Sequence, residues 1–380
     1  MVNYNLLEDY EKDMLSYQEF NNRILDNSIV LLKGKNYPVF VGRGLGLKIN
    51  TSIGINHNER YKDEVEKIHT IAKHSFKPDI MMDLSTTKIS TPLYLNIIEK
   101  IGCPVGTIPH YLCFNSKKGI DKYELLETIE QQAQNGVSFM TLHVTADLRM
   151  AEKTYSRVIP VISRGGSLLL RDMRINNRNE NIILECLEEI IKILKKYSVV
   201  ISLGTTFRPS TLSDAMDEVN LQEISEQHKI AKKLKSHGLR ILMEGIGHIP
   251  IVKIPDYVSI LRKEQYIPFM PLGPIVSDRT QGEDHITSAI GACQIALLNG
   301  ADIINSVTRE EHTGGIPNIS SILEAIDVAN TVVKIINDAR FSKYFTKNSK
   351  EYFNCMGKSD SLGCERCGKE CPFIWNKSLV

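Results

Sequence analysis

Three cysteines near the end of the chain have the spacing of metal ligands. Cys364, Cys367 and Cys371 form a C-x2-C-x3-C run, and Cys355 precedes them. In a reducing compartment such a cluster indicates a metal site rather than disulfides. Thiolates suit both zinc and iron–sulfur clusters, and the run alone favours neither. A zinc site that holds the tail in place needs a fourth ligand, for which Cys355 is the candidate. A 4Fe–4S cluster held by three cysteines instead leaves one iron open to a ligand.

Polar side chains that could bind an anion or move a proton follow β-rich runs in the middle of the chain. Arg164 precedes two glycines, and a guanidinium beside exposed backbone N–H groups is a natural phosphate site. Arg208 could add a second cation, and Glu244 could accept hydrogen bonds or move a proton. Taken alone, each arginine is more often half of a structural ion pair, and a lone histidine is more often an ordinary polar contact.

These side chains need a scaffold that brings many strand ends together. From about residue 78 the chain alternates short apolar runs, typical of strands in a parallel sheet, with amphipathic helical stretches. The expected strands are 79–84, 103–106, 138–143, 158–162, 199–203, 239–244, 266–270 and 302–307. Eight strands predict an α/β protein with a (β/α)8 barrel of the TIM type, whose sites lie at the carboxyl ends of its strands. A doubly wound open sheet is the alternative, but no Gly-rich phosphate fingerprint follows the first strand.

The barrel is expected over residues 78–330, between an N-terminal cap (1–77) and a C-terminal helix with the Cys-rich tail (331–380). Hydrophobic residues make up 42% of the chain, and 46 Lys+Arg nearly balance 45 Asp+Glu, so the formal net charge is +1. This balance, without a basic, aromatic-rich face, argues against nucleic acid as a partner. No apolar run approaches the length of a membrane span, and no signal peptide is recognisable. We therefore expect a cytoplasmic protein that binds neither a membrane nor nucleic acid.

Ten short motifs spread over residues 40–375 carry a family resemblance. They are Gly42–Gly54, Met82–Thr86, Pro104–Pro109, Ser163–Ser167, Ser202–Pro209, Asp214–Glu218, Glu244–Pro250, Leu272–Pro274, Asp284–Gly291 and Val307–His312. In this order they resemble the ThiC (phosphomethylpyrimidine synthase) family of thiamine biosynthesis. One such motif is weak evidence, whereas ten in the family's order are highly specific.

The resemblance implies a radical S-adenosylmethionine enzyme, a lyase whose 4Fe–4S cluster is held by the C-terminal tail. Family members cleave S-adenosylmethionine reductively, and the 5′-deoxyadenosyl radical rearranges 5-aminoimidazole ribotide (AIR). The cluster would be held by the three closely spaced cysteines, with Cys355 as a possible addition. The resemblance also implies a homodimer and an external electron donor. A second, related subunit stays open as a further partner.

The family motifs also assign roles inside the barrel. The residues implied to hold the ribotide are Asn50, Met82, Tyr111, His143, Ser163, Arg164, Gly165, Arg208 and Glu244. Among these we expect Glu244, Arg208 and His143 to take part in catalysis. His248 and His312 match the two family histidines that bind a divalent metal, expected to be zinc, beside S-adenosylmethionine. Two histidines leave coordination positions open for a ligand.

Several positions depart from the family pattern and favour a divergent relative. The last cysteine spacing is three residues where the family has four, and Thr205-Thr206 and Met270 stand where the family has Asp-Gly and Tyr. Losing a carboxylate and a phenol is not neutral for a multistep rearrangement. We therefore favour a product like that of 5-hydroxybenzimidazole synthase, the lower ligand of anaerobically made cobamides, over the pyrimidine phosphate of thiamine.

Two readings from other classes remain open. A barrel hydrolase that uses only zinc at His248 and His312 would need neither iron nor the tail. A non-catalytic binding or regulatory relative would use the cysteine tail as a zinc staple or as a nucleic-acid knuckle, although the charge balance argues against nucleic acid.

Overall fold

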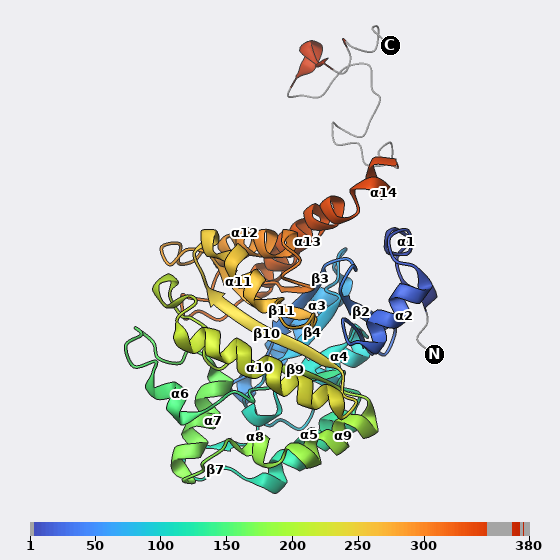
Figure 1. The fold of residues 1–380 in the computed structure, drawn as a ribbon. Coiled ribbons are helices and arrows are strands. Elements are labelled where there is room, and N and C mark those ends of the chain that lie inside the picture. Colours follow the sequence, from blue (N-terminus) through green and yellow to red (C-terminus); the bar gives the residue numbers. More distant parts are fainter. Residues whose placement is uncertain (1–3, 348–366, 373–374, 376–380) are drawn as a thin grey trace. The chain divides into compact units, whose positions relative to one another are not determined.

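The computed structural model describes residues 4–347, 367–372 and 375 of the chain (Figure 1). The chain divides into two compact units, Met1–Arg340 and Phe341–Val380, which are described separately. Among the described residues, no helix combines the length and the apolar character needed to cross a membrane.

The first unit is built around a parallel sheet of eight strands. In chain order they are β3 (Lys48–Ile53), β4 (Ile80–Asp83), β5 (Val105–Thr107), β8 (Phe139–Leu142), β9 (Val200–Leu203), β10 (Ile241–His248), β11 (Phe269–Ile275) and β12 (Ile303–Asn305). Their order in the sheet is β11-β10-β9-β8-β5-β4-β3-β12, and the paired strands are parallel. The two outer strands also meet, because the Asp302 N–H donates to the Phe269 carbonyl at 2.9 Å. The predicted TIM-type barrel is therefore confirmed.

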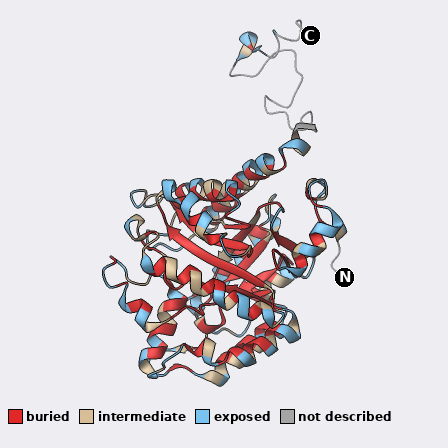
Figure 2. Cartoon of the chain, in the orientation of Figure 1, coloured by how far each residue is buried: buried red, intermediate tan, exposed pale blue. Residues whose placement is uncertain are grey.

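Helices cover the outside of the barrel and join its strands (Figures 1 and 2). They are α3 (Tyr61–Lys73), α4 (Leu93–Lys100), α5 (Lys122–Gln134), α6 (Leu148–Glu152), α7 (Arg164–Ile175), α8 (Ile182–Glu185), α9 (Leu187–Tyr197), α10 (Glu218–Ser236), α11 (Ile254–Leu261), α12 (Asp284–Leu297) and α13 (Ile319–Arg340). Their apolar sides pack against the strands in one large cluster of buried residues. Figure 2 shows the strands buried and the outward faces of these helices exposed.

A short β-hairpin closes the amino-terminal end of the barrel. It consists of β1 (Ile29–Leu32) and β2 (Val39–Gly42), which pair antiparallel and follow α1 (Asp9–Lys12) and α2 (Tyr17–Leu25). Val30 and Val41 of the hairpin share a buried cluster with residues at the starts of the barrel strands, among them Ile80 and Phe139. Because this end is filled by apolar side chains, the opposite end is left for a ligand.

One of the expected strands is wrong, and one strand of the barrel was not expected. Residues 158–162 are not a strand but a bent segment before α7, in which Val158 is 78% exposed. Pro160 lies within this run, and proline cannot donate to a sheet ladder. The strand that completes the set of eight is β3, the first barrel strand along the chain, which lies inside the region expected to be the cap. Its sequence, Lys-Ile-Asn-Thr-Ser-Ile, is too polar to stand out by hydrophobic pattern, so the barrel begins 30 residues earlier than residue 78, at Lys48.

The second unit begins with α14 (Ser342–Lys347) and includes a short 3-10 turn, η7 (Gly368–Glu370). Within it, the Cys371 carbonyl accepts from the Trp375 N–H at 3.2 Å, and the Trp375 indole N–H donates to the Lys369 carbonyl at 2.7 Å. These local bonds order the residues around the last of the tail cysteines.

Candidate functional site

The barrel residues expected from sequence all lie on the strands of the barrel or on the segments that follow those strands. Asn50, Met82 and Glu244 are on strands, Tyr111 is on the 3-10 helix η3 (Pro109–Tyr111) after β5, and His143 directly follows β8. Ser163, Arg164 and Gly165 begin α7, Arg208 follows β9, His248 ends β10 and His312 follows β12. The fold therefore gathers residues that are up to 262 positions apart at one end of the barrel.

A cavity of about 380 Å³ opens at this end. Of the expected residues, Arg164, Arg208, His248 and His312 line it, together with Arg60 and the ion pair of Lys67 with Glu64. The other expected ligand residues do not line this cavity, and most of them are buried. They are Asn50, Met82, Tyr111, His143, Ser163, Gly165 and Glu244.

Tyr111 connects the cavity wall to the buried residues. The Arg164 guanidinium lies over the Tyr111 ring, 5.6 Å from its centroid. Burial raises the pKa of Tyr111, while the charges of Arg164 and Arg208 oppose that shift and Glu244 adds to it. The phenol, both guanidinium groups and the carboxyl group are thus close enough to interact electrostatically.

The start of α7 is shaped for a close approach of other groups. Ser163 caps this helix, accepting from the Gly166 N–H at 3.2 Å. A Cβ atom on Gly165 would lie 2.3 Å from His143 Cε1, and one on Gly166 would lie 2.4 Å from a methyl carbon of Thr206. Because His143 and Thr206 occupy the space where a side chain would lie, only glycine fits at either position, and the first turn of α7 packs closely against these residues.

Glu244 is held by two hydroxyl groups, one from β8 and one from β9. Its Oε1 accepts from Thr141 Oγ1 at 2.6 Å and from Ser202 Oγ at 2.7 Å. The side chain is buried, and burial raises the pKa of Glu244, although both hydroxyl groups and the charge of Arg208 favour the ionised form. A buried carboxyl group with a raised pKa is suited to accept and return a proton.

His248 and His312 form a pair whose inner nitrogens face each other. Their Nε2 atoms are 3.0 Å apart, while His248 Nδ1 is 2.6 Å from Asp278 and His312 Nδ1 is 2.8 Å from Asp284. Burial lowers the pKa of His248, although Asp278 opposes that shift. A carboxylate on Nδ1 with Nε2 left facing a partner is the usual arrangement of metal-binding histidines. The donor set therefore fits a divalent cation such as zinc, although no group of three or more His, Cys, Asp or Glu side chains within the described residues forms a complete metal site.

The residues that depart from the family pattern make defined contacts inside the barrel. Thr205 Oγ1 donates to Glu223 at 2.7 Å, and the Thr206 N–H donates to the same carboxylate at 2.6 Å. Met270 is buried next to Glu244 in the register of β10 and β11, in an apolar cluster that includes Met82. Thus Thr205 is engaged by a buried glutamate, and Met270 presents an apolar surface at this level of the barrel.

Sequence reasoning missed two buried residues close to these positions. Glu223 of α10 also accepts from the Phe207 N–H at 2.9 Å, so it fixes the backbone directly before Arg208. His110, the neighbour of Tyr111, has its ring centroid 5.2 Å from that of His143. Neither stands out in the sequence; the only available signal was their position beside residues already expected in the site.

The cysteine tail is described only in part. Cys367 is exposed, Cys371 is buried, and the Cys367 carbonyl accepts from the Glu370 N–H. The other two expected ligands, Cys355 and Cys364, lie outside the described residues. The arrangement of the three cluster cysteines therefore stays a prediction.

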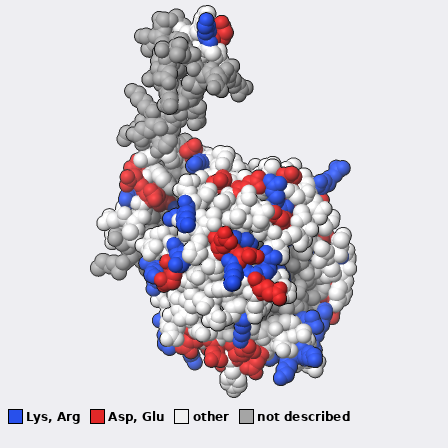
Figure 3. Space-filling view, turned by 180° about the vertical axis from the view of Figure 1, so that it is seen from behind, with Lys and Arg blue, Asp and Glu red and all other residues white. Residues whose placement is uncertain are grey.

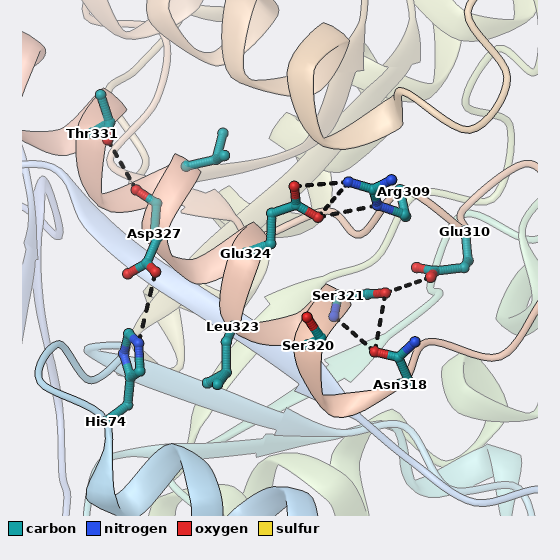
Figure 4. A pocket seen from close by; sticks show the side chains of 11 residues that line it. His74, Arg309, Glu310, Asn318, Ser320, Ser321, Leu323, Glu324, Asp327 and Thr331 are labelled. Atoms are coloured by element: carbon teal, nitrogen blue, oxygen red, sulfur yellow. Dashed lines mark hydrogen bonds and ion pairs between the residues drawn. The ribbon is translucent and has the colours of Figure 1, made fainter.

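A larger and more open depression of about 810 Å³ lies outside the barrel, beside α13 (Figure 4). Its polar groups mostly pair with one another: Arg309 donates to both oxygens of Glu324, and Ser321 donates to Glu310 at 2.6 Å. None of the residues expected to bind a ligand lines it. The contacts in Figure 4 instead tie the loop that carries His312 to α13.

The fold and this site together define an enzyme of the (β/α)8-barrel class with a polar ligand cavity at the carboxyl ends of its strands. A model described as the Radical SAM ThiC family matches residues 5–352, so the chain belongs to that family. It is a radical S-adenosylmethionine enzyme with rearrangement or lyase chemistry, and an iron–sulfur cluster and S-adenosylmethionine are the cofactors that the family implies.

Curated relatives agree with this assignment over almost the whole chain. The phosphomethylpyrimidine synthase of Finegoldia magna is 34% identical, covering 97% of this chain and 93% of its own. That of Sulfurisphaera tokodaii is 31% identical, covering 97% and 94%. Among solved structures, a dihydropteroate synthase of Xanthomonas albilineans with 4-aminobenzoic acid has a TM-score of 0.40 at 10% identity, covering 80% of this chain and 98% of its own. A likeness this weak bears on neither fold nor function.

Proposed function

We propose that this enzyme uses a 5′-deoxyadenosyl radical to rearrange 5-aminoimidazole ribotide into a cofactor-precursor heterocycle, and we favour 5-hydroxybenzimidazole as the product. The observation that carries the proposal is the convergence of Arg164, Arg208 and the His248–His312 pair on one cavity of a chain in the ThiC family. When bound, the cluster and S-adenosylmethionine supply the radical. The remaining steps belong to the residues of the barrel.

The ribotide phosphate fits the positive end of the cavity. Arg164 lines the cavity with its guanidinium and is the first residue of α7. Arg208 reaches the same cavity from the loop after β9. Bidentate arginines beside helix N–H groups are strong phosphate ligands.

The azole end of the ribotide fits the buried side chains below the cavity. Glu244 would accept from ring or amino N–H groups and move a proton as bonds rearrange, because its carboxyl group is buried and has a raised pKa. His143 would contact the ligand from the neighbouring strand end, with Asn50, Met82 and Tyr111 completing the surroundings.

The two possible products rest on different observations. The names of the relatives favour the pyrimidine phosphate of thiamine as the alternative product. Thr205, held by Glu223, and Met270, buried beside Glu244, favour a changed outcome, because a carboxylate and a phenol of the family pattern are missing here. We give the second observation more weight because it concerns the residues of the site itself.

His248 and His312 would hold a zinc ion through their Nε2 atoms, in reach of the cavity that both line. His312→Ala should therefore abolish stoichiometric zinc, measured by elemental analysis of protein purified with added zinc. His57→Ala, an exposed histidine, is the matched control and should keep the metal. Equal zinc in both variants would contradict the assignment.

The central test is anaerobic turnover with a reductant, S-adenosylmethionine and AIR. We expect 5′-deoxyadenosine together with a fluorescent benzimidazole, whereas a pyrimidine phosphate would establish the alternative product. Cys367→Ser should lose iron and activity, while Cys293→Ser, on the barrel helix α12, should retain both. Wild-type protein that forms no 5′-deoxyadenosine above background would contradict the proposal. In the same assay, a specific activity that falls as the protein is diluted would support the expected homodimer.

A further inference from the structure

His110 is a buried histidine whose imidazole makes no hydrogen bond of normal geometry. It is 0% exposed, and neither Nδ1 nor Nε2 meets that geometry with any group among the described residues. The Gly165 backbone lies near enough to favour the protonated ring, but outside that geometry. Buried polar side chains are nearly always paired, and an exception calls for a physical explanation. His143, which we expect to contact the ligand, likewise has an unpaired buried Nδ1.

The unpaired nitrogens of the two histidines point toward the same place. The rings meet edge to face, with centroids 5.2 Å apart. A Cβ atom on Gly165 would lie 2.5 Å from His143 Nδ1 and 2.8 Å from His110 Nε2, so both nitrogens lie against the Gly165 backbone at the start of α7. Arg164, which lines the cavity, is the neighbouring residue, and its guanidinium lies over the Tyr111 ring. His110 therefore belongs to the same group of side chains as the expected ligand residues.

A histidine with a purely structural role in this chain is arranged differently. His228 on α10 is also buried, but its Nδ1 lies 2.9 Å from the Ile224 carbonyl, one turn earlier in the same helix. Burial lowers the pKa of His110 to about 3, with only the Gly165 backbone opposing the shift. The His110 ring is therefore neutral and offers one donor and one acceptor, which suits an uncharged partner.

We propose that His110 is a further ligand-contacting residue of this site, and that its neutral imidazole pairs with an uncharged edge of the ligand that both donates and accepts hydrogen bonds. The amino-azole and the ribose hydroxyl groups of a ribotide both have this chemistry. The inference rests on the proposed function in taking the ligand to be a ribotide, and it adds a residue that the family motifs do not assign.

The test is equilibrium binding of AIR, without S-adenosylmethionine, to the full-length protein by anaerobic calorimetry. His110→Phe keeps a ring in the same space but removes both nitrogens, and should raise the Kd about tenfold. His110→Gln keeps a donor and an acceptor, and should stay within about threefold of wild type. His228→Phe is the matched control at a buried histidine away from the site and should leave the Kd unchanged. Binding of ribose 5-phosphate separates the two contacts: it weakens with AIR if His110 meets the ribose, and is unaffected if His110 meets the azole.

His110→Phe that binds AIR as tightly as wild type would overturn the inference. It would also be overturned if the Phe and Gln variants weakened AIR binding equally and both lowered the unfolding temperature, because packing would then explain both results. A failure of the proposed function looks different: wild-type protein itself would not bind AIR, and no variant would be needed to see it.

Discussion

At the scale of single residues, Glu244 is the strongest candidate for moving a proton. Glutamine has nearly the same shape and can still accept from Thr141 and Ser202 through its carbonyl, so Glu244→Gln should fold normally. Because an amide cannot take up a proton, we expect product formation to fall by about 10²- to 10⁴-fold. The measurement is anaerobic turnover with 5′-deoxyadenosine and product quantified together. Wild-type yields of product from Glu244→Gln would remove the residue from the chemistry.

The neutral state of His110 also predicts how stability changes with pH. In the unfolded chain a histidine has a pKa of about 6.5, whereas burial lowers the pKa of His110 to about 3 in the folded protein. Between these values the unfolded chain binds a proton that the folded chain does not, so this residue reduces stability as the pH falls. Between pH 7 and 5 its contribution amounts to about 2 kcal/mol of unfolding free energy.

The prediction is checked by urea unfolding of wild type and His110→Phe at pH 7, 6 and 5. The variant should lose less stability on acidification by that amount, whatever its stability at pH 7. An equal loss in both proteins would show that His110 takes up a proton in the folded state. His143 shares the same buried surroundings, and its pKa also lies well below the ordinary value. The variant should therefore still lose stability on acidification, but less than wild type does.

The sequence predicts a role for a residue of this site only where a recognisable motif surrounds that residue. Arg164 was recognisable by the two glycines after it, and the structure shows why they are needed, since a Cβ on either would collide with neighbouring groups. His110 and Glu223 carry no such mark. His110 is distinguished by burial without a well-formed hydrogen bond, and Glu223 by the four hydrogen bonds that it accepts. Both properties exist only in the folded chain.

At the scale of elements, one arginine joins the segment before α7 to the loop that carries Arg208. Arg157 is buried and donates to both oxygens of Asp217 at 2.7 Å, and its Nη1 donates to the Phe207 carbonyl at 3.0 Å. Asp217 also caps α10 by accepting from the Asn220 N–H. The pair therefore ties together two loops that supply cavity residues.

Arg157→Met should lower the free energy of unfolding by about 2 kcal/mol, because it removes three hydrogen bonds of a buried guanidinium and leaves the partly exposed Asp217 without its cation. It should also raise the KM for AIR, since the backbone before Arg208 loses a hydrogen bond. Arg149→Met is the matched control: Arg149 pairs with Asp147 on the exposed surface, where an ion pair contributes little. Urea unfolding of both variants checks the first effect and steady-state kinetics the second. Equal stabilities would mean that the Asp217 pairing is dispensable.

The strands show which elements a sequence can and cannot reveal. Those with nearly continuous apolar runs, such as β9, were found, because both faces of a parallel strand are buried. β3 was missed although it is almost wholly buried. Asn50 Nδ2 donates to Asn305 on the adjacent strand β12, and the Thr51 hydroxyl pairs with Ser306 just after that strand. The polar residues that hid β3 from a hydrophobic pattern are therefore part of what holds the site end of the barrel together.

At the scale of the whole chain, the charges fit a small-molecule enzyme. On the face shown in Figure 3, acidic and basic side chains are interspersed over the surface rather than gathered into a field of one sign. This agrees with the formal net charge of +1. The positive groups that matter for a phosphate are therefore those that line the cavity, Arg60, Lys67, Arg164 and Arg208, whose effect is local.

The division of the chain into two units predicts that ligand binding and radical formation can be separated. The unit Met1–Arg340 contains all eight barrel strands and the proposed ribotide and zinc residues, whereas the tail cysteines belong to Phe341–Val380. A chain cut after Lys347 should therefore fold with an unfolding temperature close to that of the full protein and should bind AIR with a similar Kd. It should hold no iron above background and form no 5′-deoxyadenosine. The full-length Cys367→Ser variant is the control, because it should show the same loss of activity with the tail present. If the shortened chain still cleaved S-adenosylmethionine, the radical chemistry would have to reside in the barrel. The tail cysteines would then be assigned to a structural zinc site, which their spacing also allows.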